Sequence, residues 1–181
     1  MKTKAVLLIL CLFLYSTINA QQPASAETIL KEAYKQAATQ KKNVFVLFHA
    51  SWCGWCHKMD TAMNDPKVKK LFTDNYVIEH LVVYESKSKK QLENPGAEDL
   101  LKKHYGNDKG IPYWLVFDAK GNLLADSKER AENGGPETGD NVGCPASEKE
   151  VAYFINVLKK TSSLKEEQLS IIAKRFRENE H

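Results

Sequence analysis

The chain has 181 residues, enough for one globular domain with a sizeable core. Its 26 basic side chains nearly balance 23 acidic ones, so the formal net charge is only +3. This balance indicates neither nucleic-acid binding nor an anionic surface as a partner. The sequence contains no internal repeat, low-complexity tract or second-domain linker.

Residues 1–20 read as a secretory signal peptide. Lys2 and Lys4 form a short positive region, and the apolar stretch 5–15 is short for a membrane span. Ala20 offers a small residue for cleavage, which removes two lysines and no acid and leaves a net charge of +1. We therefore expect export to the periplasm or the extracellular medium, with no stable membrane insertion after cleavage. The alternative is an N-terminal anchor that is never cleaved.

Three cysteines remain after that cleavage: Cys53, Cys56 and Cys144. An exported protein lives where disulfides form and persist. A disulfide within the motif Cys53-Gly54-Trp55-Cys56 would close a very small loop and would constrain the unfolded chain little. The motif therefore favours redox exchange or metal binding over a structural disulfide. Cys144 either docks a loop as a small side chain or acts as a third redox thiol.

Apolar periodicity and start signals predict six helices. In chain order they cover 26–42, 56–63, 66–72 and 97–105, and two more open at the capping boxes Ser147-x-x-Glu150 and Ser163-x-x-Glu166. The third is expected to have Asp65 as its N-cap and Pro66 at its first position.

Four strands are predicted between these helices. They cover 44–48, 76–84, 113–117 and 122–125. The first two are apolar runs typical of buried strands, and the last two are joined by a hairpin turn. Residues 85–95 and 127–146 read as loops. The order of elements indicates an α/β fold with a mixed central sheet between helices.

Dithiol exchange needs two neighbouring thiols in unequal environments. A cysteine at the start of a helix has its thiolate stabilised by the helix dipole, and we expect Cys53 to be exposed there as the nucleophile. Cys56 lies one turn further on and would be the shielded, resolving thiol. Together they would form a redox-active disulfide.

Two segments around this motif carry a resemblance: VFVLFHASWCGWC at 44–56 and YGNDKGIPYWLVF at 105–117. They resemble the active-site strand and the second signature of the thioredoxin family. The resemblance covers roughly residues 40–126 and the helix at 147–160. Among exported members, the chain is most similar to the soluble C-terminal domain of DsbD-type thiol:disulfide interchange proteins.

The resemblance implies a thioredoxin-like fold in which a cis bond between Ile111 and Pro112 faces the dithiol. Substrate chains would be bound by Trp52, Trp55, Ile111 and Pro112. The implied domain order is a signal peptide, an N-terminal helical lead-in, a thioredoxin-like domain and a C-terminal helical extension. These segments span 1–20, 21–42, 43–161 and 162–181.

The implied activity is thiol–disulfide exchange with protein disulfides, with no cofactor and no metal. The expected partners are protein thiols and disulfides, including a membrane-bound reductant donor, and no nucleic acid. We expect a monomer. Reductase, oxidase and isomerase directions all stay open at this point.

One position departs from the family. Thioredoxins usually carry a buried Asp six residues before the nucleophile, where this chain has Leu47. Strand alternation places His49 on the same face, nearer the dithiol, and its unperturbed pKa is near 6.5. His49 is therefore a candidate proton acceptor for Cys56, unless it only packs beneath the helix. Glu79 and His80 are weaker candidates.

Three other functions compete with redox exchange. The stretch 53–57 also matches C-x-x-C-H, the covalent attachment site of c-type haem, although a buried strand directly before it is unusual there. A structural zinc site would need a second ligand pair, but His80, His104 and His181 stand alone. The third alternative is a thioredoxin-fold chaperone or interaction module whose dithiol is dispensable.

Overall fold

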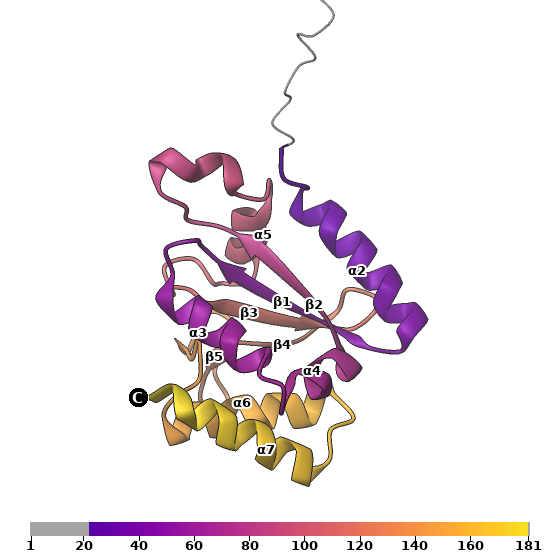
Figure 1. Ribbon diagram of the computed structural model, residues 1–181. Helices are drawn as coiled ribbons and strands as arrows, with labels where there is room; N and C mark the ends of the chain where they lie inside the picture. The colour runs from indigo at the N-terminus through magenta and orange to yellow at the C-terminus, as the bar shows by residue number, and fades with distance from the viewer. Residues whose placement is uncertain (1–21, 181) are drawn as a thin grey trace, which may run out of the picture.

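A four-stranded mixed sheet runs through the middle of the molecule (Figure 1). The computed structural model describes residues 22–180, so the signal-peptide prediction and His181 lie outside the described residues. In sheet order the strands are β2 (Tyr76–Val82), β1 (Asn43–His49), β3 (Tyr113–Phe117) and β4 (Leu123–Asp126). Strand β1 pairs in parallel with β2 and antiparallel with β3, and β4 pairs antiparallel with β3. The predicted mixed sheet is confirmed.

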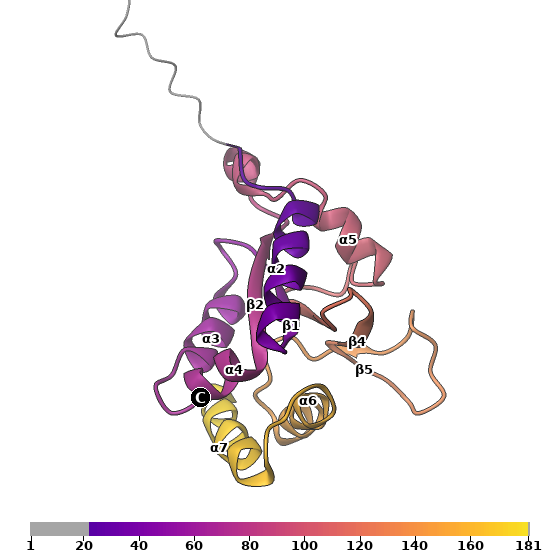
Figure 2. The ribbon, with the colours of Figure 1, turned by 90° about the vertical axis from the view of Figure 1, so that its right-hand side faces the viewer.

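Helices cover both faces of this sheet (Figure 2). On one face lie α2 (Ala26–Gln40) and α5 (Ala97–Lys103). The other face is covered by α3 (Gly54–Met63), α4 (Lys69–Asn75), α6 (Glu148–Thr161) and α7 (Glu166–Arg177). Short elements complete the described chain: η1 (Lys87–Leu92), β5 (Lys128–Glu129), β6 (Asp140–Asn141) and η2 (Glu178–Glu180).

Strand β1 explains why there are two cores. Its apolar run sends Val44, Val46 and Phe48 toward α2 and α5, and Phe45 and Leu47 toward α3, α6 and α7. Alternation of successive side chains makes a continuous apolar run suitable for a strand that is covered on both faces. The C-terminal helix α7 belongs to the second core, because its apolar side chains are buried there together with those of α6.

Two predicted helix starts are wrong. Residues 65–68 form a turn in which Asp65 Oδ1 accepts the Lys67 N–H at 2.9 Å, and α4 begins only at Lys69. Ser163 does not cap α7, because its N–H and hydroxyl both donate to Asn75 Oδ1. The N-cap of α7 is Lys165, whose N–H donates to Gln168 Oε1.

The other capping box is confirmed. Ser147 Oγ accepts the Glu150 N–H, and Glu150 Oε2 accepts the Ser147 N–H. This arrangement satisfies two backbone donors that the first turn of α6 would otherwise leave unpaired. It sets the point at which the chain leaves the segment 139–146 and enters the second core.

The two predicted loops contain regular structure. The 3₁₀ helix η1 lies within 85–95, and strands β5 and β6 pair antiparallel within 127–146. The second predicted strand also ends earlier than expected, at Val82, and its middle is only half-buried because β2 is an edge strand. Such short elements carry too few residues to show a periodicity in the sequence.

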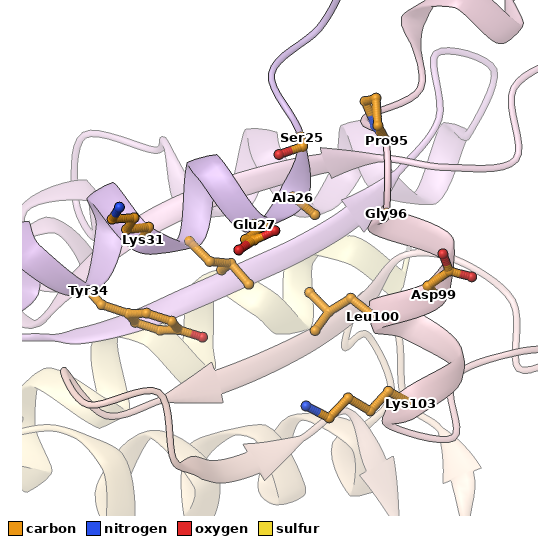
Figure 3. A pocket seen from close by; sticks show the side chains of 11 residues that line it. Ser25, Ala26, Glu27, Lys31, Tyr34, Pro95, Gly96, Asp99, Leu100 and Lys103 are labelled. Atoms are coloured by element: carbon orange, nitrogen blue, oxygen red, sulfur yellow. The ribbon is translucent and has the colours of Figure 1, made fainter.

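A groove of about 810 Å³ lies between α2 and α5 (Figure 3). Leu30, Tyr34 and Leu100 line it, with Lys31 and Asp99 among its charged residues. It lies over the face of the sheet opposite α3, so it is separate from the cysteine motif. Among residues 22–180, no helix combines the length and the apolar character needed to cross a bilayer.

Candidate active site

Cys53 and Cys56 form a disulfide at the N-terminus of α3. Strand β1 ends at His49, and a short turn over 50–52 leads directly into the helix. Cys53 is the N-cap, and its Sγ accepts the backbone N–H of Cys56 at 3.1 Å. After reduction, this N–H and the helix dipole would stabilise negative charge on the same sulfur.

The two cysteines lie beneath a rim of exposed tryptophans. Cys53 is only 4% exposed and Cys56 2%, whereas Trp52 and Trp55 are 59% and 50% exposed. The expectation of an exposed first cysteine is therefore wrong for this disulfide state, because Ala50 and the partly buried Ile111 pack against the pair.

The loop before β3 faces the disulfide. The Ile111–Pro112 peptide bond is cis, as expected, and the Ile111 carbonyl oxygen lies 3.5 Å from Cys53 Sγ. This is a contact rather than a hydrogen bond, because a disulfide sulfur carries no proton. The Ile111 N–H has no hydrogen-bond partner within the described residues. Backbone groups left free beside a reactive sulfur can pair with an extended chain.

A buried carboxylate, Glu85, holds the turn before Cys53. It accepts hydrogen bonds from the N–H and the hydroxyl of Ser51, and Lys89 Nζ donates to the same hydroxyl oxygen. Burial raises the pKa of Glu85, but the hydrogen bonds from Ser51 outweigh it and leave the pKa below its ordinary value. Sequence reasoning missed Glu85, because it stands at the start of a stretch that reads as a polar surface loop.

His49 belongs to a short chain of titratable side chains. Its ring packs edge-on against His80 with centroids 5.2 Å apart, and His80 Nε2 lies 2.7 Å from Asp60 Oδ1. Asp60 comes from α3. This series of side-chain contacts therefore connects the end of β1, through β2, with the helix that begins at the cysteines. The two other residues singled out in the sequence lie in the sheet. Leu47 is buried in the core, as an apolar side chain at that position requires. Glu79 is half-buried, and burial raises its pKa.

The surroundings of His49 favour its neutral form. Burial is the main cause that lowers its pKa below the ordinary value of 6.5, and the electrostatic effects of His80 and His57 act in the same direction, against those of Asp60 and Glu85. A neutral imidazole can accept a proton, whereas an imidazolium cannot. His49 is thus held in the state that a proton acceptor requires.

The family of the chain follows from comparison with known proteins. A family model described as thioredoxin-like matches residues 25–119, more than half of the chain. The chain belongs to the thioredoxin-like family. The match begins before α2 and ends just after β3, so the 127–146 segment and helices α6 and α7 lie outside it. No curated protein matches the sequence.

Several solved structures are similar to this thioredoxin-like chain. A disulphide isomerase from Xylella fastidiosa Temecula1 is 20% identical, with a TM-score of 0.47 over 61% of this chain and 79% of that one. The DsbD C-terminal domain of Neisseria meningitidis, in its oxidised form, is 23% identical, with a TM-score of 0.40 over 57% and 84%. A DsbH oxidoreductase is 19% identical, with a TM-score of 0.44 over 80% and 92%.

Cys144 is not part of the disulfide, although it lines a groove together with Trp55 and Ile111. It is buried, with 6% exposure, and Asn179 Nδ2 donates to its sulfur at 3.5 Å. Burial raises the pKa of its thiol to about 12. A thiol with this pKa is almost wholly protonated at neutral pH and is a poor nucleophile. The geometry therefore favours the interpretation of Cys144 as a packing residue.

The haem and zinc alternatives gain no support from the geometry. Both cysteines that a haem would need are bonded to each other, and His57 Nε2 lies 3.1 Å from the Ser51 carbonyl oxygen. Between residues 22 and 180, His, Cys, Asp and Glu side chains do not gather in threes in a way that could hold a metal ion.

Proposed function

We propose that this chain is an exported thiol–disulfide oxidoreductase that exchanges electrons with protein disulfides. The observation that carries the proposal is the Cys53–Cys56 disulfide at the N-terminus of α3, beside the backbone N–H of Ile111, which is unpaired within the described residues. The disulfide supplies the redox chemistry, and the free backbone supplies a place for an extended substrate chain. Trp52 and Trp55 would contact that chain at the exposed rim.

The exchange proceeds in two balanced steps. In the reduced protein, the Cys53 thiolate attacks one sulfur of a substrate disulfide, the substrate S–S bond breaks, and a substrate thiolate leaves and takes up a proton. Cys56 then loses a proton and attacks Cys53 Sγ, which closes the Cys53–Cys56 disulfide and releases the second substrate thiol. Two electrons and two protons pass to the substrate, and a dithiol donor must return them.

Export and the donor rest on the sequence alone. The signal-peptide pattern of residues 1–20 supports release into the periplasm or the extracellular medium. An oxidising compartment requires a reductant supplied across the membrane, so we propose a membrane-bound dithiol protein as the donor. The protein would act as a monomer, since one chain contains both cysteines.

Equilibration with glutathione buffers tests the proposed function. The dithiol should titrate as a two-electron couple with a potential between about −270 and −120 mV, the range of known dithiol proteins. A value near the lower end supports a reductase, and one near the upper end an oxidase. Thiol labelling and mass spectrometry of the folded protein measure the oxidised fraction. A pair that never forms a disulfide at any glutathione ratio would refute the proposal.

His49 is the proposed proton acceptor for Cys56. Replacing it with glutamine should slow the closing of the Cys53–Cys56 disulfide on the order of 10²-fold, since the general base is lost. In the wild-type protein this rate should stay high below pH 6.5 and fall only as the pH drops through the lowered pKa of His49. Rapid quenching of a preformed mixed disulfide at several pH values measures the rate.

His104 provides the matched control for that variant. It too is half-buried, and burial lowers its pKa, but its ring packs against Phe117 in β3 and not against the His80 side chain that His49 contacts. His104→Gln should keep both the rate and the pH profile of the wild type. Identical profiles for His49→Gln and the wild type would show that His49 only packs beneath α3.

A further inference from the structure

Asn141 joins the segment 127–146 to the loop that faces the dithiol. Its side-chain Nδ2 lies within hydrogen-bond distance of three carbonyl oxygens in that loop, at 3.1 Å from Lys109, 3.2 Å from Gly110 and 3.0 Å from Pro112. These carbonyls surround Ile111 on both sides. One half-buried amide therefore holds the backbone on either side of the residue that contacts Cys53.

The other end of the same amide is also fixed. Asn141 Oδ1 accepts a hydrogen bond from the Ser127 hydroxyl at 2.7 Å and from the Gly143 N–H at 3.0 Å. Ser127 is fully buried and its hydroxyl accepts the backbone N–H of Trp114 in β3. With both ends engaged, the side chain has no freedom to rotate, and its donors stay aimed at the loop.

Two further contacts tie the same segments together. Lys109 Nζ donates to the Gly139 carbonyl at 3.1 Å. Gly143 has φ +60° and comes so near the loop that an added Cβ would lie 3.3 Å from the Pro112 carbonyl oxygen. Glycine suits this position, because a side chain would strain the left-handed backbone and crowd the Pro112 carbonyl. The segment 139–143 therefore packs directly on the loop and is held there by hydrogen bonds.

A groove of about 220 Å³ opens where these segments meet Trp55. Ile111, Pro112 and Val142 line it together with Asn141. Its two walls come from the loop and from the segment that lies outside the family match. Asn141 bonds to both walls, and Lys109 joins them at the far end. The Trp114 indole, two residues beyond Pro112, also donates to the Gly143 carbonyl at 2.9 Å, but it does not contact the loop carbonyls on either side of Ile111.

We propose that Asn141 is a positioning residue for polypeptide substrates. It fixes the Ile111–Pro112 backbone relative to Cys53, so that an extended substrate chain can pair with Ile111 while its disulfide reaches the sulfur. The inference rests on the proposed function. A small aromatic disulfide that needs no backbone pairing reaches Cys53 without this alignment, so Asn141 separates the two substrate classes.

Two variants test this role with insulin as the polypeptide disulfide and 5,5′-dithiobis(2-nitrobenzoate) as the small one. Asn141→Asp keeps the shape and the acceptor of the side chain but removes its N–H donors, and Asn141→Ala removes both. Each should raise KM for insulin about 10-fold, the factor expected for one lost hydrogen bond, with kcat within about twofold. The rate with the small disulfide should also stay within about twofold of the wild type.

Asn122→Ala is the control for general loss of structure. Asn122 also holds a turn through its side-chain amide, but its Nδ2 donates to a side chain, Asp118 Oδ2, at 2.7 Å. That turn lies beyond Phe117, which pairs with Val44 at the opposite end of β1 from the cysteines. The control should leave both substrates unaffected. Circular dichroism and the midpoint of urea unfolding show whether each variant is folded.

The outcomes separate this inference from the proposed function. An active wild type whose Asn141→Asp variant keeps its KM for insulin would overturn the positioning role alone. An equal loss of activity on both substrates would overturn that role too, since such an effect belongs to the dithiol or to the fold. A wild-type protein that reduces neither substrate would overturn this inference, and one whose dithiol also never forms a disulfide in the glutathione buffers would overturn the proposed function as well.

Discussion

Cys53→Ser is expected to lower the rate of insulin reduction on the order of 10³-fold or more, to the level of the buffer control. A serine hydroxyl does not ionise near neutral pH and cannot form a disulfide with the substrate. The dipole of α3 and the Cys56 N–H would stabilise a thiolate at position 53, but the variant has no thiol there to ionise. Turbidity of reduced insulin, with dithiothreitol as donor, measures the rate.

Cys56→Ser should give a different result from Cys53→Ser. The first step still occurs, but the resolving thiol is missing, so the mixed disulfide between Cys53 and the substrate accumulates. Non-reducing electrophoresis and mass spectrometry detect this adduct. Accumulation in Cys56→Ser and its absence in Cys53→Ser would assign the two roles directly.

Cys144→Ala is the matched control for both cysteine variants. It also removes a sulfur, but one that is buried and whose pKa is raised to about 12. We expect the wild-type rate and no adduct. If Cys53→Ser instead keeps full activity in a holdase or binding assay, the chain acts as a chaperone or interaction module with a dispensable dithiol.

Long apolar patterns predicted the framework of the fold. Strand β1 was recognisable because five consecutive apolar residues bury side chains on both faces of the sheet. The motif from Cys53 to Cys56 could be placed at a helix start because strand, turn and helix follow one another along the chain. Ile111 and Pro112 could be placed opposite it only through the family resemblance, since the contact spans 58 positions along the chain.

The features that the sequence patterns did not predict have a common physical cause. Glu85 and Asn141 act through hydrogen bonds to backbone groups far away in the sequence, and such contacts leave no periodic pattern. The start of α7 was misplaced because Ser163 finds a partner in Asn75 rather than in its own helix. Tertiary contacts overrode local start signals in these places. The groups that orient the candidate site are therefore the part that sequence patterns revealed least.

Phe154→Ala is expected to destabilise the protein by about 3–5 kcal/mol, the usual cost of truncating a buried phenylalanine. Phe154 on α6 is fully buried at the centre of an aromatic cluster. Its ring centroid lies 6.3 Å from those of Phe45 and Phe72, 5.5 Å from Trp114 and 4.9 Å from Phe176. These partners belong to β1, α4, β3 and α7, so one cavity loosens four elements at once.

Urea unfolding of the oxidised protein measures this loss, and the thermal midpoint should fall by roughly 6–20 °C. Leu92→Ala, at a side chain 43% exposed on η1, should change stability by less than about 0.5 kcal/mol. A loss below about 1 kcal/mol for Phe154→Ala would mean that α6 and α7 do not share a core with the sheet. The C-terminal helix would then be an appendage. The burial of Phe176 argues that it is a structural part of the domain, although it lies beyond the family match.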